Sequence, residues 1–440
     1  MKDEKVSSIP PGDDMNFKKL CTPLDHRISR RQWLGGVAGT TAGALGLCQP
    51  GLAQELRRRR KQVLFVWLEG GLSQLESWDP KPNTLFGGPF RAIPTTVPGI
   101  HISELWPRTA QQMRHLAVIR SLHTQDNNHS SGVGRIQRGD PANRGVTYPY
   151  FGSAVANLLG PGESGLPPYI WVKPGSGGFV TSDAGFLGPR YGALALGGGR
   201  APENLLRADS VSEEDDRERL ALRQLADRRY VQQRRTQGTE ANSYVYDMAA
   251  QLQRHAHLFN STTLPARDLE RYGPSEFGRH MLLGRRLLEA GVTFVKVDSH
   301  GWDTHGDNFN GHSNAVPKID QAFSAMMQDL ADRSMLDNVL VVLMSEFGRT
   351  PRINGHIGRD HWAEGWSLVM AGSGIRRGVV VGRTNALGTF VEGDEHDIGH
   401  LFHTWFTALG INPSRTRYNN AGQPLPIAHE DMEPIRALLA

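Results

Sequence analysis

The chain has 440 residues, of which 38% are hydrophobic and 21% charged, and its formal net charge is +4. This is the composition of a globular protein with enough apolar surface for a substantial core. Much of the positive charge lies in Arg57–Lys61, which we interpret as a solvated edge beside the first strand. Nucleic acid is therefore not an expected partner.

The N-terminal residues have the order of segments that is typical of a twin-arginine signal peptide. Arg30 and Arg31 stand in the sequence Ser-Arg-Arg-Gln-Trp-Leu, and an uncharged run follows over Gly35–Ala53. The run ends in Gly-Leu-Ala, which suits cleavage, and it is too rich in glycine and too short for a bilayer span of about 20 residues. We expect residues 1–53 to be removed and the twin-arginine translocase to be a partner. The mature protein should lie in the periplasm or outside the cell, without a transmembrane segment.

Both cysteines of the chain, Cys21 and Cys48, precede the expected cleavage point. The mature chain would then have no disulfide, thiolate ligand or cysteine nucleophile. A lipoprotein anchored through Cys48 is less favoured, because Leu47 occupies a position where a small residue is wanted. The long polar leader leaves Met15 open as an alternative start.

Six short apolar runs are spaced along the rest of the chain, with helical patterns between several of them. Such runs are typical of buried strands, and strands separated by helices predict an α/β fold with a mostly parallel central sheet and helices on both faces. We expect one domain over residues 54–440, with a helical insertion at about 205–290 where charged residues become dense. The six runs are Val63–Leu68, His115–Arg120, Tyr169–Val172, Val292–Val297, Val339–Met344 and Ser367–Ala371.

Carboxylates and imidazoles follow several of these runs directly. Because binding sites of such sheets lie beyond the carboxyl ends of the strands, we expect these side chains to share one edge. Asp303 and His305 lie two residues apart on one loop, Glu346 follows a buried strand, and Asp360 and His361 are adjacent. Imidazole and carboxylate together suit a divalent ion such as Zn²⁺, Mn²⁺ or Ca²⁺. The five residues are therefore candidate metal ligands, although any one of them alone could be an ordinary loop residue.

The segment Asn128–Gly132 could begin a helix. A hydroxyl of Ser130 or Ser131 would then lie at a helix N-terminus, where an anion is stabilised and an oxygen nucleophile can be activated. A serine that only caps the helix is the alternative.

Five motifs together resemble the DUF1501 family of exported bacterial proteins, and the resemblance runs from about Val63 to Leu439. That family is similar in turn to the alkaline phosphatase and sulfatase superfamily, of which it looks like a distant branch. In that comparison Glu346 stands where an aspartate ligand is expected and Phe347 replaces a histidine, and no Cys-x-Pro-x-Arg motif is present. The motifs are Gly70–Gln74, Asp79–Pro82, Gly301–His305, Glu346–Pro351 and Gly358–Trp362.

The resemblance implies an enzyme that uses one or two divalent ions, an oxygen nucleophile and groups that stabilise a charged transition state. Ser130 or Ser131 would be the nucleophile, and Arg349 or Arg135 would contact the anion. The predicted function is a metal-dependent hydrolase of phosphate or sulfate esters, with a small molecule or an anionic polysaccharide as substrate. The alternative is an exported, non-catalytic binding protein on a degenerate hydrolase scaffold, which the missing histidine at Phe347 would favour.

Overall fold

We describe a computed structural model of the chain. The structure describes residues 61–139, 144–202, 205, 208, 210–233, 237–260 and 264–440. The predicted signal peptide over residues 1–53 lies outside them. None of the helices in the described part is long and apolar enough to cross a bilayer.

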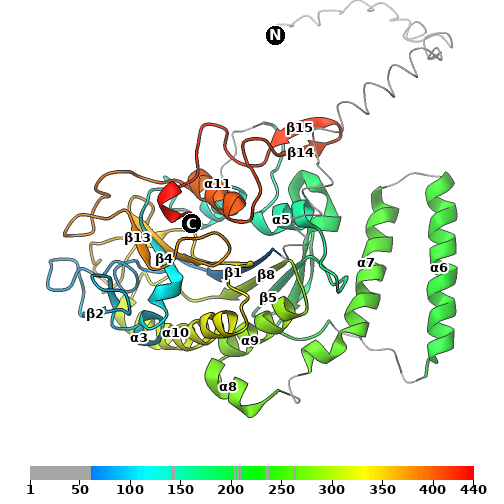
Figure 1. Ribbon diagram of the computed structural model, residues 1–440, viewed down its shortest axis with the longest axis horizontal. Coiled ribbons are helices and arrows are strands. Elements are labelled where there is room, and N and C mark those ends of the chain that lie inside the picture. Colours follow the sequence, from blue (N-terminus) through cyan, green and yellow to red (C-terminus); the bar gives the residue numbers. More distant parts are fainter. Residues whose placement is uncertain are drawn as a thin grey trace, which may run out of the picture. The chain divides into compact units, whose positions relative to one another are not determined.

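A nine-stranded sheet runs through the centre of the described residues (Figure 1). β12 is antiparallel to both of its neighbours and β6 is antiparallel to β7, whereas the other strands all point in one direction. The sheet is therefore mostly parallel, as predicted. In spatial order the strands are β13 (Val379–Val381), β4 (Leu116–Leu122), β12 (Trp366–Ala371), β9 (Val339–Met344), β1 (Gln62–Leu68), β8 (Phe294–Ser299), β5 (Tyr169–Lys173), β7 (Ala193–Gly197) and β6 (Gly178–Val180).

All six predicted strands are present, and β1 shows why the apolar runs form them. Its seven residues are all buried. Leu64, Val66 and Leu68 belong to the hydrophobic cluster on one face of the sheet, whereas Phe65 and Trp67 belong to the cluster on the other face. A strand covered on both faces gains from apolar and β-branched residues at every position, so its sequence is continuous rather than alternating.

Helices cover both faces of the sheet, as predicted. On one face α3 (Pro107–Ala110), α9 (Glu276–Glu289) and α10 (Asn308–Asp332) pack against one hydrophobic cluster. On the other face, α4 (His129–Arg138), α5 (Phe151–Leu159) and α11 (Ile398–Ala408) pack against the second cluster. The two layers lie on opposite sides of the sheet in Figure 1.

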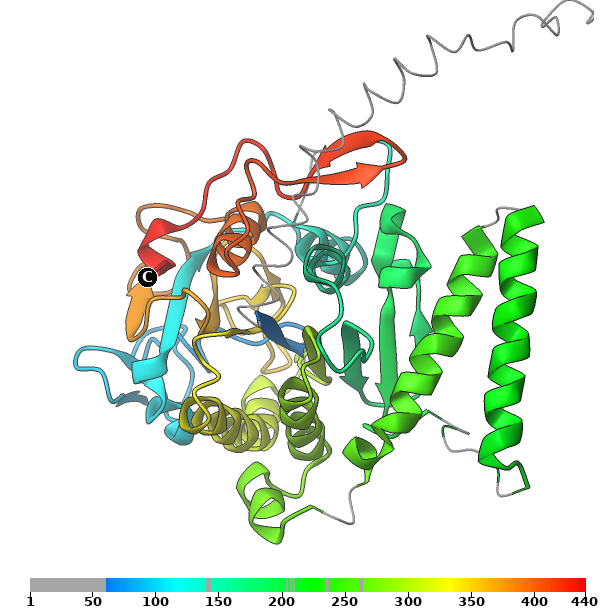
Figure 2. The ribbon, with the colours of Figure 1, turned by 45° about the vertical axis from the view of Figure 1, so that its right-hand side comes forward.

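The helices after residue 205 have two different environments. α6 (Glu213–Gln233) and α7 (Gln237–Arg254) form a hairpin beside the end of the sheet that holds β7 and β6 (Figure 2). α8 (Ala266–Tyr272) packs on α9 and α10, and α9 itself packs directly on β8, β5 and β1. The boundaries of a separate insertion at 205–290 stay a prediction, but α9 is a helix of the core.

A buried ionic group joins α8, α9 and α10. Asp329 on α10 is fully buried, and it accepts hydrogen bonds from Arg285 on α9 and from the Tyr272 hydroxyl on α8, both at 2.8 Å. Arg271 adds an ion pair at 2.6 Å. Since these partners satisfy the carboxylate, its burial fixes the three helices against one another.

Short elements complete the fold. The small strands are β2 (Ala92–Pro94), β3 (His101–Ser103), β10 (Gly348–Arg349), β11 (His361–Trp362), β14 (Arg417–Asn420) and β15 (Gln423–Pro426). The 3₁₀ helices are η2 (Met113–His115), η3 (Ser182–Leu187), η4 (Pro189–Tyr191), η5 (Ala256–Phe259) and η6 (Arg436–Leu438).

Candidate metal centre

The loops after β1, β4, β8 and β9 leave the sheet at the same edge, because these strands point in one direction. β12 runs the opposite way, so the residues just before it also reach this edge. Trp366, at the start of β12, pairs with Leu122 at the end of β4. His361, in β11, therefore comes to the place where Asp303 and Glu346 arrive from β8 and β9.

Three imidazoles meet at the carboxylate of Asp303. The Nε2 atoms of His305 and His361 lie 3.1 and 3.0 Å from its Oδ1 and only 2.9 Å from each other. The Nε2 atom of His129 lies 3.4 Å from Oδ2. The sequence reasoning had included Asp303, His305 and His361 among the ligands, and the structure brings these three together.

Each of these histidines donates from its other ring nitrogen to an acceptor. The Nδ1 atoms of His305 and His129 lie 2.8 Å from carboxylate oxygens of Asp360 and Glu346, and Nδ1 of His361 lies 2.7 Å from a backbone carbonyl. A carboxylate or carbonyl can only accept, so the protons belong on Nδ1. All three Nε2 atoms then present lone pairs towards Asp303.

This donor set fits a divalent cation. Nitrogen lone pairs 2.9 Å apart repel each other unless a proton or a metal ion lies between them. Ligand atoms about 2.0–2.1 Å from a tetrahedral ion lie roughly 3.3 Å apart, close to the separations between Asp303 and each imidazole. The ligand atoms of His129, Asp303 and His361 all lie within 4.8 Å of one another, and His305 is outside that group. The charge of Arg349 and, above all, burial lower the pKa of His361, which favours the neutral imidazole that a metal requires.

Asp303 is held in place from below by the backbone and by Arg349. Gly70 has φ +119°, and a Cβ there would lie 2.5 Å from the Asp303 nitrogen, so only glycine allows this approach. The Arg349 guanidinium contacts Asp303 Oδ1 at 2.5 Å. Burial alone would raise the pKa of Asp303, but the Arg349 contact outweighs it and holds that pKa well below its usual value. Trp302, the residue before Asp303, is buried.

Arg349 lies beneath Asp303, and its predicted contact with a substrate anion stays a prediction. Its side chain is fully buried, and besides Asp303 it donates to the backbone carbonyls of Gly70, Gly71 and Arg359. Few of its donors remain for a ligand. Its contacts identify it as a residue that positions Asp303. Arg135, the other candidate, is paired with Asp397.

Glu346 and Asp360, two further predicted ligands, lie behind the imidazoles instead of beside Asp303. Glu346 is fully buried and accepts from Gly70 N at 2.9 Å as well as from His129. Burial raises its pKa, and these hydrogen bonds oppose the shift. Carboxylates in such places orient metal-bound histidines and make them more basic. The Oε2 atom of Glu346 is buried without a hydrogen-bond partner among the described residues.

Phe347, which replaces a histidine in the motif comparison, forms the floor of the imidazole group. Its ring is buried, with centroids 4.4 Å from His361 and 5.0 Å from His129. The ring supplies no ligand, and it restricts the planes of both imidazoles.

The predicted serines lie in the first turn of α4, next to His129. Asn128, not a serine, is the N-cap, because its side chain accepts from Ser130 N at 2.8 Å. Both serines are exposed, and the Ser131 hydroxyl donates to Asp126 at 3.1 Å. Their role as nucleophiles stays a prediction.

A second group of possible ligands lies at the ends of β1 and β8. Glu69, Asp298 and His300 offer ligand atoms that all lie within 4.8 Å of one another. Asp298 is buried, and neither of its oxygens has a hydrogen-bond partner among the described residues. The Lys296 ammonium is 3.7 Å from Oδ1, and burial raises the pKa of Asp298 to about 6.

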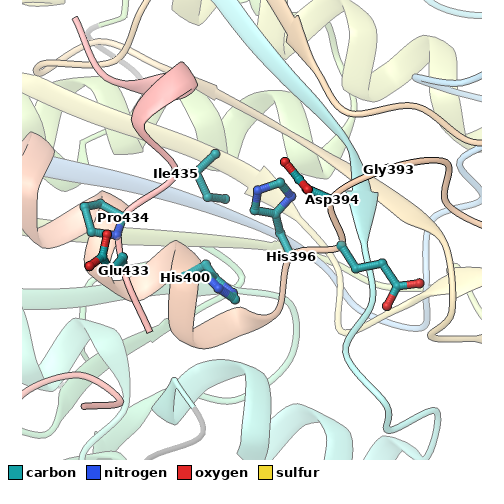
Figure 3. A pocket seen from close by; sticks show the side chains of 8 residues that line it. Gly393, Asp394, His396, His400, Glu433, Pro434 and Ile435 are labelled. Carbon is teal, nitrogen blue, oxygen red and sulfur yellow. The ribbon is translucent and has the colours of Figure 1, made fainter. Parts of the chain in front are cut away.

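The cavity shown in Figure 3 is lined by residues other than those of the imidazole group. It has a volume of about 540 Å³ and is lined by His396, His400 and Glu433, among others, between the start of α11 and the C-terminal segment. His123 faces this side, since its Nδ1 lies 2.8 Å from Glu395. Neither Asp303 nor the three histidines around it line this cavity.

His129 is a candidate ligand that the sequence analysis does not single out, because it has no partner motif in sequence. The sequence feature that could have indicated His129 is its position at the start of a helix that follows a strand. Its closeness to Glu346, 217 positions away, depends on the fold alone.

Structural comparison matches the chain with several solved proteins at low sequence identity. Alkaline phosphatase from the Antarctic bacterium TAB5 has 11% identity, with 80% of this chain and 98% of that chain covered and a TM-score of 0.34. The lipoteichoic acid synthase LtaP from Listeria monocytogenes has 9% identity, coverages of 84% and 75%, and a TM-score of 0.35. A sulfatase from Pseudoalteromonas sp. has 13% identity, coverages of 88% and 76%, and a TM-score of 0.37.

Sequence comparison with curated proteins finds no match. The profile of a family described as "Protein of unknown function (DUF1501)" matches residues 60–439, which is nearly the whole described part of the chain. The chain therefore belongs to the DUF1501 family.

Proposed function

We propose that this protein is a metal-dependent hydrolase of phosphate or sulfate esters that works outside the cytoplasm. The observation that carries the proposal is the convergence of three Nε2 lone pairs on the Asp303 carboxylate, with each Nδ1 held by an acceptor. Hydrogen bonding within the protein leaves these lone pairs facing one another, and a divalent cation would satisfy all of them.

His129, His361 and Asp303 would hold the ion, because their ligand atoms lie within 4.8 Å of one another. His305, whose Nε2 lies 2.9 Å from that of His361, would complete the site. Mostly nitrogen donors favour Zn²⁺ or Mn²⁺ over Ca²⁺, which prefers oxygen. When bound, such an ion polarises a phosphoryl or sulfuryl oxygen and stabilises developing negative charge. Asp360 and Glu346 would keep the histidines in the ligating tautomer.

The first turn of α4 would receive the anionic ester. Ser130 and Ser131 lie next to His129, and the backbone N–H groups of a helix N-terminus favour an anion. Either hydroxyl could then act as the oxygen nucleophile, as the sequence motifs imply. Ser130 is the better placed, because the Ser131 hydroxyl is already bonded to Asp126.

A second divalent ion would bind Glu69, Asp298 and His300. The buried Asp298 carboxylate, without hydrogen bonds to its oxygens among the described residues, supports this part of the proposal. Lys296 reduces the negative charge of this group, so we expect weaker binding here than at Asp303.

Export through the twin-arginine route is part of the same proposal. It rests on Arg30 and Arg31 with the uncharged run after them. This route would deliver a folded protein, so a metal ion could be inserted before export.

Metal analysis and hydrolysis assays on the purified protein test the proposal. We expect at least one bound ion per chain, a rise in thermal midpoint with Zn²⁺ or Mn²⁺, and hydrolysis of p-nitrophenyl phosphate or p-nitrophenyl sulfate. His361→Ala should lose all three properties, and His123→Ala, outside the imidazole group, should keep them. A metal-free protein that ignores added ions would overturn the proposal. Metal binding without hydrolysis of any ester would favour the binding-protein alternative.

A further inference from the structure

We propose that Asn354 is a positioning residue that fixes Asp360 and, through it, the imidazole of His305 in its ligating geometry. The inference rests on the proposed metal site. Asn354 lies in the long loop over residues 350–360 that joins β10 to β11. Its amide nitrogen donates to the backbone carbonyl of His305 at 2.9 Å and to Asp360 Oδ1 at 3.1 Å.

The orientation of this amide is unambiguous. Its Oδ1 accepts from the backbone N–H groups of His356 and Gly358, both at 2.9 Å, which can only donate. Its Nδ2 faces a carbonyl and a carboxylate, which can only accept. All four hydrogen bonds would be lost if the amide were flipped, so the two donors must face His305 and Asp360.

The two residues that Asn354 joins come from different parts of the fold. His305 lies in the loop after β8, and Asp360 ends the β10–β11 loop. Both side chains are about half exposed, at 46% and 54%, so packing alone does not fix them. Asp360 orients His305 through Nδ1, and the same Oδ1 atom accepts from Asn354. Asn354 thus positions the Asp360 carboxylate, which in turn orients the His305 imidazole.

The backbone of this turn is strained and closely packed against the ligand loop. Ile357 has φ +55°, an unusual conformation for a β-branched residue. A Cβ at Gly358 would lie 1.9 Å from the His305 carbonyl oxygen. Strain of this kind persists where the surrounding contacts impose it, and the two acceptor bonds of Asn354 are among those contacts.

Asn354→Asp tests whether Asn354 positions Asp360 and His305, while the hydrogen bonds that support the turn at His356 and Gly358 are kept. Aspartate has the same shape and keeps the acceptor for His356 N and Gly358 N, but it loses both donors and repels Asp360. An added negative charge alone would strengthen cation binding. A weaker affinity for Zn²⁺ can therefore come only from the loss of position. We expect a loss of roughly 10-fold or more, the range for residues that orient ligands.

The measurement is a Zn²⁺ titration of the full-length mature chain, together with the visible absorption spectrum of the Co²⁺-loaded protein. Asn419→Asp is the matched control, because Asn419 likewise accepts from a backbone N–H, of Gly422, in the β14–β15 hairpin. The control should bind Zn²⁺ as the parent does, while Asn354→Asp should bind less and show an altered Co²⁺ band. If the parent binds Zn²⁺ and Asn354→Asp matches it in affinity and spectrum, the positioning role is overturned. If the parent binds no metal, the metal site is overturned as well.

Discussion

Replacement of Asp303 by alanine is the most direct test of the metal centre. Its carboxylate lies 3.0–3.4 Å from the Nε2 atoms of three histidines, within the ligand-to-ligand range of about 3.3 Å around a tetrahedral ion. The variant would lose the only negative charge among the converging donor atoms. We expect Zn²⁺ affinity to fall by at least the roughly 10–100-fold that follows changes in the ligand shell. This corresponds to about 1.4–2.8 kcal/mol of binding free energy or more.

Competition titration against a chromogenic chelator measures this change for the parent, Asp303→Ala and His123→Ala. His123 pairs with Glu395 on the side of the separate cavity, so its variant should bind Zn²⁺ as the parent does. Without metal, Asp303→Ala should also unfold at a lower denaturant concentration, because it removes the carboxylate that pairs with the fully buried Arg349. Zn²⁺ affinities are therefore compared under conditions in which both proteins are folded. Equal Zn²⁺ affinity of parent and Asp303→Ala would refute the assignment of the loop that carries Asp303 to the site.

Three further changes test other parts of the structure. Gly358→Ala should lower both Zn²⁺ affinity and the thermal midpoint, because the new methyl group would lie 1.9 Å from the His305 carbonyl oxygen; an unchanged midpoint would contradict the close approach. Asp329→Asn should lower the free energy of unfolding at pH 7 by about 1–3 kcal/mol, since the neutral amide no longer pairs with Arg271 and Arg285, while Arg285 keeps its ion pair with Asp268. Burial raises the pKa of Asp329, but its arginine and tyrosine hydrogen bonds outweigh burial and hold that pKa below its usual value. Its stabilisation is therefore present above about pH 4 and lost as the pH falls through the folded-state pKa, so urea titrations of parent and variant should converge at low pH. Lysine at both Arg30 and Arg31 should keep the precursor in the cytoplasm, and normal export of that double variant on cell fractionation would point to another route.

The sequence by itself determined the strands and the edge at which the site forms. The runs at β1, β4, β5, β8, β9 and β12 are continuous and apolar because those strands are covered on both faces. Burial of a strand can therefore be predicted from its amino-acid composition. Polar side chains directly after such runs have few places to go except the edge of the sheet. For that reason Asp303, His305 and Glu346 could be named together without coordinates.

The tertiary structure decided which neighbours each side chain of the candidate site has. Whether a carboxylate lies beside Asp303 or behind an imidazole depends on differences of a few ångströms, and the structure places Glu346 and Asp360 against the Nδ1 atoms of His129 and His305. Arg349 looked available for an anion, but the turns of Gly70 and Gly71 bury it and take its donors. A sequence pattern records whether a position is buried, but it does not record which partners surround it.

The direction of β12 and the arrival of His129 also depended on the fold. A buried antiparallel strand has the same apolar composition as a parallel one, so the run at β12 gave no sign that His361 would precede it at the site edge. His129 meets Glu346 across 217 positions because α4 starts where β4 and β9 both end. Local patterns arise from burial and backbone geometry, which act over a few residues. The meeting of distant ligands arises from strand order and loop paths, which only the folded chain specifies.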